Sequence, residues 1–541
     1  MKDISSTGSF VDFTLENFIY VDKTVYIPQL VKLKRVFISR PRRFGKSLTL
    51  DTIATLFETG VEPYFKGTWI YDKWTEPTYP VLRLNFLNFD KNTLEKFNNK
   101  LNSKITEFAE LNQVTTYKEK DEAEDSIDHL LEQLRLEGRQ IVILIDEYDC
   151  QMTANINNET LYKQFQEKIK SFYANIKDKF AIKFLGITGV TRLKDVSIFS
   201  VGSDINDITN ASAYSQMIGF TRDEIKNYYI DYLKLASSYE NNCSVDDVTD
   251  TQLESMLDMM AQNYDGYCFD EDYEKKVFST WSVNKFFQTM IEKKKVQFGE
   301  YWYDNGGLPS ILVNYLKTHE LNIFEYLDKD KFLKVSSDDF KNPTALTTIN
   351  QNVLMCQTGY LTLRSDLNKT STVALGIPNG EIYKALNRLL ANNIFKGNTD
   401  ITDDYGRSLL EVGTVDDIIN LFNSALNSVS YDNYPIVSES SVQNMLKLYL
   451  LGAHQEVLSE VHEAKGRADL VVNTDNRRIV FEFKYAKNEA EAKSKLSEAV
   501  EQIKTRDYGN ILPKKNELIR IAAVFNADPK VRAFTENQIV P

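Results

Sequence analysis

An uninterrupted apolar run at residues 141–145 ends in two adjacent carboxylates, Asp146 and Glu147. A short apolar run bounded by charged residues is typical of a strand that helices cover on both faces, as in parallel sheets. Similar runs, separated by helix-like segments, recur in the first 235 residues at 35–39, 80–86 and 181–190. This alternation predicts an N-terminal α/β domain with a mostly parallel sheet.

The segment RPRRFGKS at 40–47 joins one of these strands to a helix predicted at 47–60. A loop in this place offers backbone N–H groups and a helix N-terminus to phosphate oxygens. We expect Lys46 to reach the terminal phosphates of ATP and Ser47 to bind Mg²⁺. The usual pattern begins with glycine, and Arg40 stands in its place. The residues expected to contact the nucleotide are Arg40, Pro41, Arg42, Arg43, Phe44, Gly45, Lys46 and Ser47.

The acidic pair at the end of the 141–145 run supports a nucleotide site, because two carboxylates beside a core are costly unless a cation or water uses them. We expect Asp146 to hold Mg²⁺ and Glu147 to orient or deprotonate the attacking water. Within GITGVTR, at 186–192, Thr188 is expected to sense the γ-phosphate and Arg192 to bridge to it. A surface turn and a solvated acidic loop would give the same pattern, so that alternative stays open.

A second set of polar residues lies in the C-terminal tail, where Asp469 opens an apolar strand and Glu482 follows thirteen residues later. Alternate residues of a strand share a face, so Glu482 and Lys484 point the same way, whereas Phe481 and Phe483 face the opposite side. A neighbouring strand can bring Asp469 beside Glu482, and two such carboxylates suit Mg²⁺, with Mn²⁺ as a substitute. The metal would activate water against a phosphodiester while Lys484 stabilises the developing charge. A surface salt bridge would show the same spacing.

Other polar residues of the tail are expected to extend this site. Glu460 ends the preceding strand, and Glu439 lies on the helix before it. The predicted catalytic residues are Asp469, Glu482, Lys484 and, in the N-terminal domain, Glu147. The predicted metal positions are Asp469, Glu482, Phe483, Glu460 and Glu439 in the tail, with Ser47 and Asp146 in the N-terminal domain. The residues predicted to contact nucleic acid are Arg467, Gln502, Lys504 and Arg506.

Several runs in this order resemble the bacterial AAA-ATPase-like family, which is usually fused to a PD-(D/E)XK nuclease domain. The resemblance covers nearly the whole chain. It implies a P-loop ATPase domain of AAA-like or STAND-like type, a helical middle region and a restriction-endonuclease-like α/β domain. The family accepts RPRRFGKS, so Arg40 is a family trait, but the run at 197–209 departs from its asparagine-rich segment. The runs are FIYVDKT (18–24), RPRRFGKS, ILIDEYD (143–149), ITGVTR (187–192), SIFSVGSDINDIT (197–209), GFTRDEI (219–225) and YDGYCF (264–269).

A chain of 541 residues exceeds what one hydrophobic core supports. We expect an ATPase domain at 1–220, a helical domain at 221–335, a small mixed connecting domain at 336–430 and a nuclease domain at 431–541. The sequence has no run of roughly 18 apolar residues, the length that a membrane span needs. Four separated cysteines and an N-terminus without a signal peptide predict a cytoplasmic protein.

The net charge of −13 is unfavourable for binding nucleic acid, but it is unevenly distributed. Residues 235–274 include eleven acidic side chains and no Lys or Arg, whereas residues 1–60 carry nine basic against six acidic ones. We therefore expect nucleic acid, DNA rather than RNA, to run along the end domains. The 235–274 region is either a solvated helical surface or a surface for a protein partner.

The leading hypothesis is an ATP-binding and ATP-hydrolysing protein whose nucleotide state regulates a Mg²⁺-dependent DNA nuclease. One alternative is an ATP-dependent signalling or assembly protein that uses the nuclease-like fold only to bind nucleic acid. Another is an oligomeric AAA-type remodelling motor in which cleavage is incidental. The intact set of Asp469, Glu482 and Lys484 speaks against the first alternative, and the second predicts an oligomer with robust ATP turnover.

Overall fold

The computed structural model forms two compact units, Met1–His319 with Phe332–Ile382, and Glu320–Lys331 with Tyr383–Pro541. The boundary between the units falls inside helix α15 (Gly380–Ile394). It coincides with none of the predicted borders, so the four-domain division stays a prediction. The residues that the structure describes are 1–177, 179–193, 205–302, 310–316, 319, 323–343, 345–395, 405–453, 456–463, 466–509 and 517–541.

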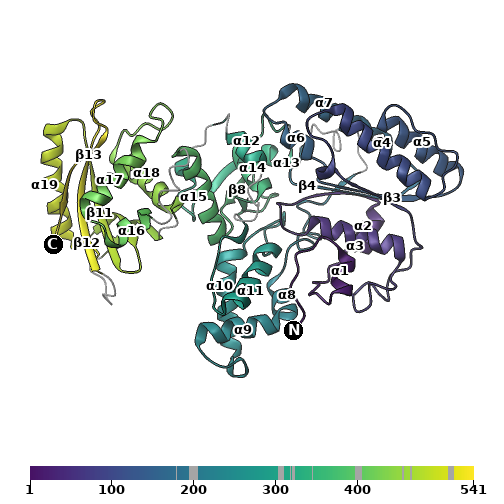
Figure 1. Cartoon of the computed structure of the whole chain (residues 1–541), viewed down its shortest axis with the longest axis horizontal. Helices are drawn as coiled ribbons and strands as arrows, with labels where there is room; N and C mark the ends of the chain where they lie inside the picture. The colour runs from purple at the N-terminus through teal and green to yellow at the C-terminus, as the bar shows by residue number, and fades with distance from the viewer. Residues whose placement is uncertain are drawn as a thin grey trace. The chain divides into compact units, whose positions relative to one another are not determined.

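A five-stranded parallel sheet lies at the centre of the first unit, with strand order β2-β3-β4-β1-β5. Figure 1 shows α2 and α3 on one face of this sheet and α4, α5 and α7 on the other. Every residue of β3 is buried, as its apolar run predicts. The N-terminal α/β prediction is therefore confirmed. The strands are β1 (Arg35–Ser39), β2 (Val81–Asn85), β3 (Ile141–Asp146), β4 (Ile182–Gly189) and β5 (Asn206–Asp207).

The helices of this part alternate with the strands along the chain. They are α1 (Phe10–Leu15), α2 (Ile27–Leu33), α3 (Lys46–Thr59), α4 (Leu94–Leu111), α5 (Ala123–Leu136), α6 (Cys150–Ala154) and α7 (Glu159–Ile176). The strands of a parallel sheet all end at the same edge, and in such folds ligands bind outside that edge. The RPRRFGKS loop follows β1 and Asp146-Glu147 ends β3, so both lie at this edge.

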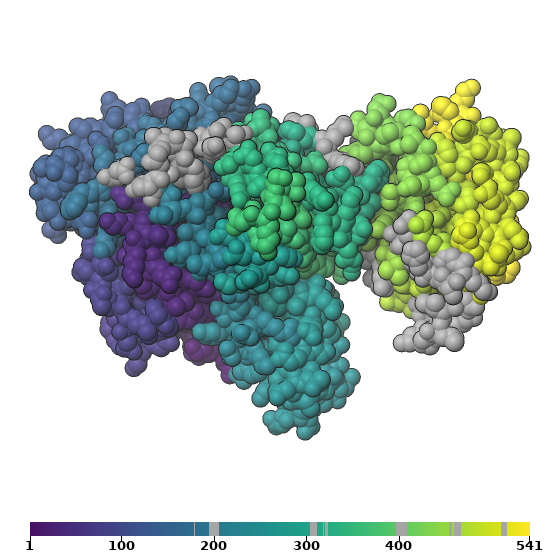
Figure 2. Space-filling model, turned by 180° about the vertical axis from the view of Figure 1, so that it is seen from behind, coloured from purple at the N-terminus to yellow at the C-terminus, as the bar shows by residue number. Residues whose placement is uncertain are grey.

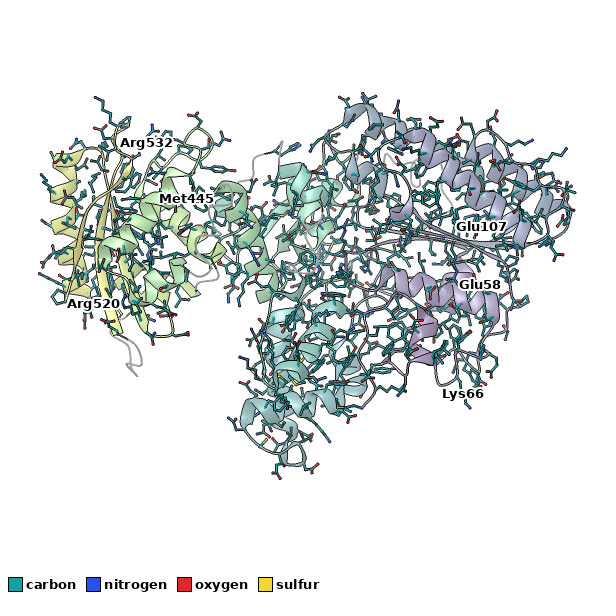
Figure 3. All side chains as sticks on the ribbon, viewed as in Figure 1. Glu58, Lys66, Glu107, Met445, Arg520 and Arg532 are labelled. Atoms are coloured by element: carbon teal, nitrogen blue, oxygen red, sulfur yellow. The ribbon has the colours of Figure 1, made fainter. Side chains whose placement is uncertain are left out.

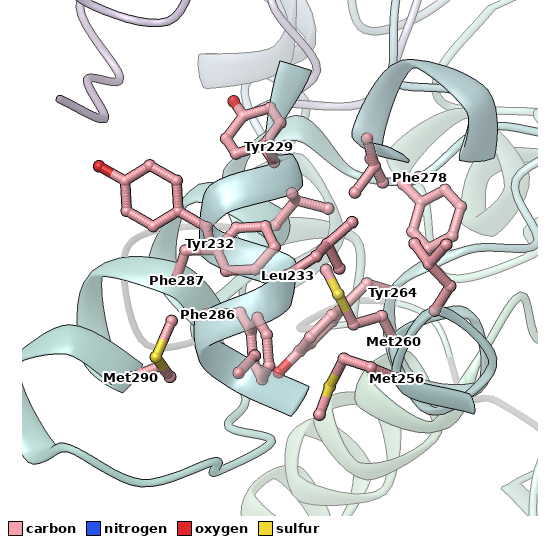
Figure 4. Packing of buried hydrophobic residues seen from close by; sticks show 14 of the residues in the cluster. Tyr229, Tyr232, Leu233, Met256, Met260, Tyr264, Phe278, Phe286, Phe287 and Met290 are labelled. Carbon is pink, nitrogen blue, oxygen red and sulfur yellow. The ribbon is translucent and has the colours of Figure 1, made fainter. Parts of the chain in front are cut away.

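A helical region follows, as predicted, and packs around an aromatic and methionine-rich core (Figure 4). Tyr229 and Phe287 stack there with ring centroids 5.4 Å apart. The N-terminal residues add to this region, since Asn284 Nδ2 donates to Ser5 O at 2.9 Å, and Figure 2 shows the purple N-terminus against the teal helices. The helices are α8 (Arg222–Tyr228), α9 (Ile230–Asn241), α10 (Asp250–Tyr264), α11 (Thr280–Lys293) and α12 (Ser310–Leu316).

The acidic 235–274 region lies mostly on α9 and α10. Part of its charge is neutralised, because Arg222 pairs with Glu254 and Asp258, and Lys226 also pairs with Glu254. These pairs fit the solvated-surface interpretation, and the protein-partner surface stays a prediction.

A small antiparallel sheet of order β6-β8-β7 completes the first unit, with α13 (Ser337–Lys341) and α14 (Gln351–Thr358). Its strands are β6 (Leu333–Ser336), β7 (Thr362–Leu363) and β8 (Thr372–Gly376).

The second unit contains a five-stranded sheet of order β13-β12-β11-β10-β9, in which only the β11–β12 pair is parallel. Helix α19 connects these two parallel strands, and apolar residues of α19 pack on the sheet. Phe422 of α17 packs on Phe481 with ring centroids 5.4 Å apart. The strands are β9 (Glu456–Glu463), β10 (Gly466–Asn473), β11 (Arg477–Ala486), β12 (Glu517–Asn526) and β13 (Ala533–Ile539). The helices besides α15 are α16 (Tyr405–Val412), α17 (Val415–Asn427), α18 (Glu439–Gly452) and α19 (Glu489–Arg506).

The helix predicted at Glu439 and the strands predicted at Glu460, Asp469 and Glu482 are present as α18, β9, β10 and β11, whereas β13 was not predicted. The strand AFTENQI is mostly polar and contains only three apolar residues, so its pattern does not stand out. Together the parallel sheet, the helical middle and the C-terminal sheet confirm the predicted α/β fold class. Within the described part of the chain, no helix is long and apolar enough to cross a membrane.

Two candidate active sites

The RPRRFGKS loop turns sharply before α3 because two of its residues have positive φ. Arg43 has φ of +69° and Gly45 has φ of +102°. Glycine adopts this conformation without the penalty that a Cβ brings, which explains the glycine before Lys46. Gly45 is also the N-terminal cap of α3, and its carbonyl accepts from Thr49 N at 3.0 Å. The turn therefore directs the first N–H groups of α3 toward the loop.

Lys46 is nearly completely buried and holds the loop together. Its Nζ donates to the carbonyl oxygens of Arg40 at 3.0 Å and Pro41 at 3.2 Å. The same atom lies 3.6 Å from Oε1 of Glu147. The ammonium group is thus positioned between the loop and the end of β3.

Asp146 connects three elements of the sheet edge. Its Oδ2 accepts from Ser47 Oγ at 2.6 Å, and its Oδ1 accepts from Thr188 Oγ1 at 2.6 Å and from Glu147 N at 3.0 Å. A serine hydroxyl beside a carboxylate is the donor set that Mg²⁺ prefers, so these residues fit the ion. When bound, Mg²⁺ would neutralise charge on the phosphates.

Glu147 is the candidate base at this site. Burial raises the pKa of its carboxyl group, and the charge of Lys46 opposes that rise. A carboxylate with a raised pKa accepts a proton from water more readily than an exposed one does. Glu147 has φ of +53°, an uncommon conformation that sets its side chain beside Lys46.

A cavity of about 460 Å³ opens above the loop, within the size range of small-molecule sites. Its lining includes loop residues 42–47 and Glu147 at one end. The rest of the lining includes the N-terminal segment 5–8, several residues between 13 and 30, residues 217–220 and the start of α11. The structure therefore brings Arg42, Arg43, Phe44, Gly45, Lys46, Ser47 and Glu147 to one cavity.

Three residues predicted to contact nucleotide have side chains that bind other groups of the protein, so their contact with nucleotide stays a prediction. The Arg40 guanidinium is buried, donates to Thr209 O at 2.6 Å and lies 4.1 Å from the centre of the Phe269 ring. Arg192 pairs with Asp207 and donates to Lys341 O. Thr188 is buried against Asp146 rather than exposed to the cavity.

Pro41 and Asp146 also lie outside the cavity lining. Of the 197–209 run, residues 197–204 lie outside the described residues.

Residues far along the chain support the loop and were not predicted from the sequence. The Arg43 guanidinium lies 4.1 Å from the centre of the Trp281 ring, and Thr280 Oγ1 donates to Arg43 O at 3.0 Å. Trp302 Nε1 donates to Arg42 O at 3.2 Å. Nothing in the spacing of these residues relates them to the loop.

In the second unit, strand register brings the two predicted carboxylates together. Antiparallel pairing sets Leu470 opposite Phe481, so Asp469 lies beside Glu482. Asp469 Oδ2 accepts from Phe483 N at 2.8 Å, which fixes this carboxylate at the strand edge. Phe481 and Phe483 stack on each other on the opposite face of β11, as expected because alternate residues of a strand share a face.

Lys484 is bound by two carboxylates and one carbonyl. Its Nζ donates to Glu482 Oε1 at 2.8 Å, to Glu439 Oε1 at 3.3 Å and to Phe483 O at 3.1 Å. Glu439 comes from the start of α18, so the helix contributes a carboxylate where it was predicted. The ammonium group is therefore immobilised within the site.

Glu482 is completely buried, and its Oε2 has no hydrogen-bond partner among the described residues. An unpaired carboxylate oxygen in this environment is costly unless a cation binds it. Burial, followed by the charge of Asp469, raises the pKa of Glu482 to about 7. Burial also raises the pKa of Asp469. Two adjacent carboxylates with raised pKa values fit a divalent metal, which would replace their protons.

The structure gives less information on the two other predicted metal positions of the tail, Glu460 and Phe483. Glu460 belongs to β9, whose register sets Val461 opposite Ala468, but its side chain is not among those described. Phe483 contributes its carbonyl oxygen, which accepts from Lys484. Among the described side chains, no group of three or more His, Cys, Asp or Glu is arranged to hold a metal.

Two of the predicted nucleic-acid contacts, Arg506 and Gln502, bind the same tyrosine. Arg506 Nη1 donates to Tyr508 OH at 2.7 Å. The hydrogen bond to Tyr508 raises the pKa of Arg506, and the charges of Glu482 and Asp469 add to it, so the guanidinium lies within electrostatic range of both carboxylates. Gln502 also donates to Tyr508 OH, at 3.4 Å. Lys504 and Arg467 are exposed.

We expect the affinity of full-length protein for Mn²⁺ to fall about tenfold per pH unit below about 7, because a proton on Glu482 competes with the metal. The sign follows from the raised pKa, since Glu482 is protonated below this value and charged above it. Calorimetric titration with Mn²⁺ between pH 5.5 and 8.5 measures the effect. A Glu482→Gln variant removes the dependence together with the strong binding. An affinity that stays constant between pH 5.5 and 7 would contradict the assignment.

Comparison with known proteins is consistent with both sites. Residues 5–199 match the family model described as "Predicted AAA-ATPase", and residues 437–535 match the PD-(D/E)XK nuclease superfamily. A protein of Azotobacter chroococcum mcd 1, described as "Uncharacterized protein in vnfD 5'region", is 26% identical over 536 residues. The match covers 95% of this chain and 94% of that protein.

Three solved archaeal structures show only a distant likeness. Cdc6p of Pyrobaculum aerophilum has a TM-score of 0.22 at 10% identity, covering 68% of this chain and 91% of its own. The ORC2 protein of Aeropyrum pernix has a TM-score of 0.28 at 10% identity, with coverages of 68% and 91%. The ORC1 protein of the same organism, in complex with DNA, has a TM-score of 0.27 at 9% identity, with coverages of 71% and 97%.

The matched segments are those that contain the two candidate sites. The N-terminal part of this chain belongs to the predicted AAA-ATPase family, and its C-terminal part belongs to the PD-(D/E)XK nuclease superfamily.

Proposed function

We propose that this protein binds and hydrolyses ATP in its N-terminal domain and cleaves DNA with its C-terminal domain. Cleavage requires a divalent metal and is regulated by the bound nucleotide. The observation that carries the proposal is the buried Glu482 carboxylate, whose Oε2 lacks a partner among the described residues while Asp469 lies beside it. Such an arrangement is destabilising for the fold alone and suits a metal-dependent hydrolase.

The residues around Glu482 support phosphodiester hydrolysis. Asp469 and Glu482 would hold Mg²⁺ or Mn²⁺, which when bound polarises a phosphate and lowers the pKa of a water ligand. A water oxygen then bonds to phosphorus while the bond from phosphorus to the leaving sugar oxygen breaks. Lys484, held by Glu482 and Glu439, would stabilise the negative charge that develops. The exposed Lys504 and Arg467 and the nearby Arg506 would bind the DNA backbone.

The nucleotide part of the proposal is supported by the cavity above the RPRRFGKS loop. Lys46 and the N-terminus of α3 supply positive potential at one end. Ser47 and Asp146 supply oxygen ligands for Mg²⁺, and Glu147 a base for the attacking water. All of these groups belong to the first unit.

Regulation requires that the loop affects the rest of the chain, and one hydrogen-bond path within the first unit supports this. Trp302 Nε1 donates to Arg42 O at 3.2 Å, and Trp302 N donates to Oε1 of the buried Glu381 at 2.8 Å. Glu381 belongs to the first turn of α15, the helix in which the boundary between the two units falls. Nucleotide that shifts the loop would therefore act on the start of α15 through Trp302.

The experiment is cleavage of supercoiled plasmid DNA by full-length protein with Mg²⁺ or Mn²⁺, with and without ATP. We expect wild type to cut, Asp469→Asn to be inactive, and ATP to change the wild-type rate about fivefold or more. Trp302→Phe removes the Nε1 donor, so we expect it to cut while losing most of the ATP response. A parallel series with single-stranded RNA distinguishes the two nucleic acids.

Trp74→Phe is the matched control, because Trp74 Nε1 has no hydrogen-bond partner among the described residues. It should keep the ATP response, and melting curves of both variants report any loss of folding. Binding of DNA without cleavage by wild type would favour the signalling or assembly alternative. A nucleotide-dependent oligomer with rapid ATP turnover and no regulated cleavage would favour the motor.

A further inference from the structure

The RPRRFGKS loop contains three arginines, and the structure gives each a different environment. Arg40 is buried beneath the loop, where its guanidinium donates to Thr209 O and lies over Phe269. Arg43 is exposed and lies over the ring of Trp281. Both guanidinium groups are therefore occupied by protein contacts.

Arg42 differs from its neighbours. Its side chain is half-buried and lines the same cavity as Lys46 and Glu147. Among the described residues, its guanidinium takes part in no hydrogen bond, ion pair or ring contact. Its backbone is nevertheless fixed, because Arg42 O accepts from Trp302 Nε1 at 3.2 Å. Arg42 and Glu147 both line this cavity.

A half-buried arginine without a partner is expected to bind an anion that enters its cavity, since guanidinium binds phosphate oxygens through two N–H groups at once. Lys46 and the start of α3 place the phosphates at this end of the cavity. Lys46 Nζ lies 3.6 Å from Glu147 Oε1, so a phosphate bound by Lys46 would lie beside the proposed base. Arg42 lines the same cavity as Lys46 and Glu147, so it can reach the terminal phosphate.

We propose that Arg42 binds the terminal phosphate of ATP from within the same chain and stabilises its charge during hydrolysis, an inference that rests on the proposed ATPase function. In the reaction a water oxygen bonds to the terminal phosphorus, and the bond from that phosphorus to the bridging oxygen breaks. ADP leaves with the electron pair of that bond, and the proton of the water passes to Glu147. Arg42 performs in cis the role that a neighbouring subunit's arginine performs in many ATPases.

The test compares binding of ADP with binding of a non-hydrolysable ATP analogue, measured by calorimetry on full-length protein. Wild type should prefer the ATP analogue, and Arg42→Ala should lose about tenfold to a hundredfold of that preference while keeping its affinity for ADP. Arg42→Lys should recover part of it. Where hydrolysis is measured, Arg42→Ala should lower kcat by about a hundredfold or more and change KM less.

Lys66→Ala is the control for loss of one positive charge, because Lys66 is exposed on the first unit (Figure 3) and lies outside the cavity lining. It should behave as wild type. If Arg42→Ala keeps the wild-type preference for the ATP analogue, or if Arg43→Ala alone abolishes it, the assignment to Arg42 is wrong. A wild-type protein that binds neither nucleotide would instead overturn the proposed ATPase function.

Discussion

Glu482→Gln is expected to lower metal-dependent DNA cleavage by about a hundredfold to a thousandfold while leaving the protein folded. Glutamine has nearly the shape of glutamate, so the packing of β11 between β10 and β12 is kept. Its amide carries no negative charge, so it cannot bind a divalent metal as the carboxylate does or pair ionically with Lys484. Plasmid cleavage at several Mg²⁺ and Mn²⁺ concentrations measures the loss.

The same variant should not lose stability, and this separates a metal site from a structural salt bridge. The pKa of Glu482 in the folded protein is about 7, above its ordinary value, so the buried charged form is unfavourable at pH 8. Glutamine resembles the protonated form, so the metal-free variant should melt at or above the wild-type temperature at pH 8. The difference should vanish at acidic pH, where Glu482 is protonated in both the folded and unfolded states.

Glu489→Gln is the matched control, since Glu489 is an exposed residue of α19 that pairs only loosely with Lys493. It removes one carboxylate from the same unit and should retain wild-type cleavage. If the Glu482→Gln protein cleaves DNA at the wild-type rate, the assignment of the nuclease site to Glu482 is wrong. A variant that loses activity only because it melts early would support the salt-bridge interpretation.

In the C-terminal tail, the alternation of polar and apolar residues predicts part of the candidate metal site. Glu482 and Lys484 alternate with two phenylalanines, and that period of two fixes which side chains share a face. The pairing of Asp469 with Glu482 follows from the short connection between β10 and β11. The contact between Lys484 and Glu439 depends on how α18 packs, so the sequence indicated the residue but not its partner. Likewise, no pattern could predict that Glu482 Oε2 would be left without a protein partner.

The N-terminal site shows which side-chain contacts a local pattern does not predict. Gly45, Lys46, Ser47, Asp146 and Glu147 follow from a strand-loop-helix pattern and a strand end, and the structure brings them together. Arg40 and Arg192 were also predicted to contact nucleotide, because basic residues near a phosphate loop usually do. Their side chains instead bind groups contributed by 207–214, Phe269 and Lys341, segments whose proximity is a property of the tertiary fold. The charge of a residue can be read from the sequence, whereas the group that its side chain contacts depends on the tertiary fold.

Distant residues also explain why this loop works without its first glycine. In the usual loop that glycine leaves room for the chain to turn. Here the Arg40 side chain turns inward and binds Ser39 O and Thr209 O, and Trp302 and Thr280 bind the carbonyls of Arg42 and Arg43. These contacts fix the path of the chain around Lys46. The loop conformation is therefore stabilised by side chains rather than permitted by glycine.

Lys46→Met is expected to weaken ATP binding by about a hundredfold or more, because it removes the ammonium group that would contact the terminal phosphates. Methionine keeps the length and apolar stem of lysine within the buried site. Part of the expected loss of ATP binding comes from a change in the loop itself, since Lys46 Nζ also donates to the carbonyl oxygens of Arg40 and Pro41. Without that donor the loop is expected to be less ordered, and the variant to melt below wild type.

Thermal melting with and without nucleotide separates these two effects. A ligand at about a hundred times its Kd raises the free energy of unfolding by about 2.7 kcal/mol, so saturating ATP should clearly raise the Tm of wild type. Lys46→Met should begin from a lower Tm and show almost no increase with ATP. Lys66→Met, which exchanges the same groups on the exposed surface of the same unit, should keep the wild-type Tm and its full increase with ATP. An unchanged response to ATP in Lys46→Met would show that nucleotide does not bind at this loop, and regulation of the nuclease would then have to originate elsewhere in the chain.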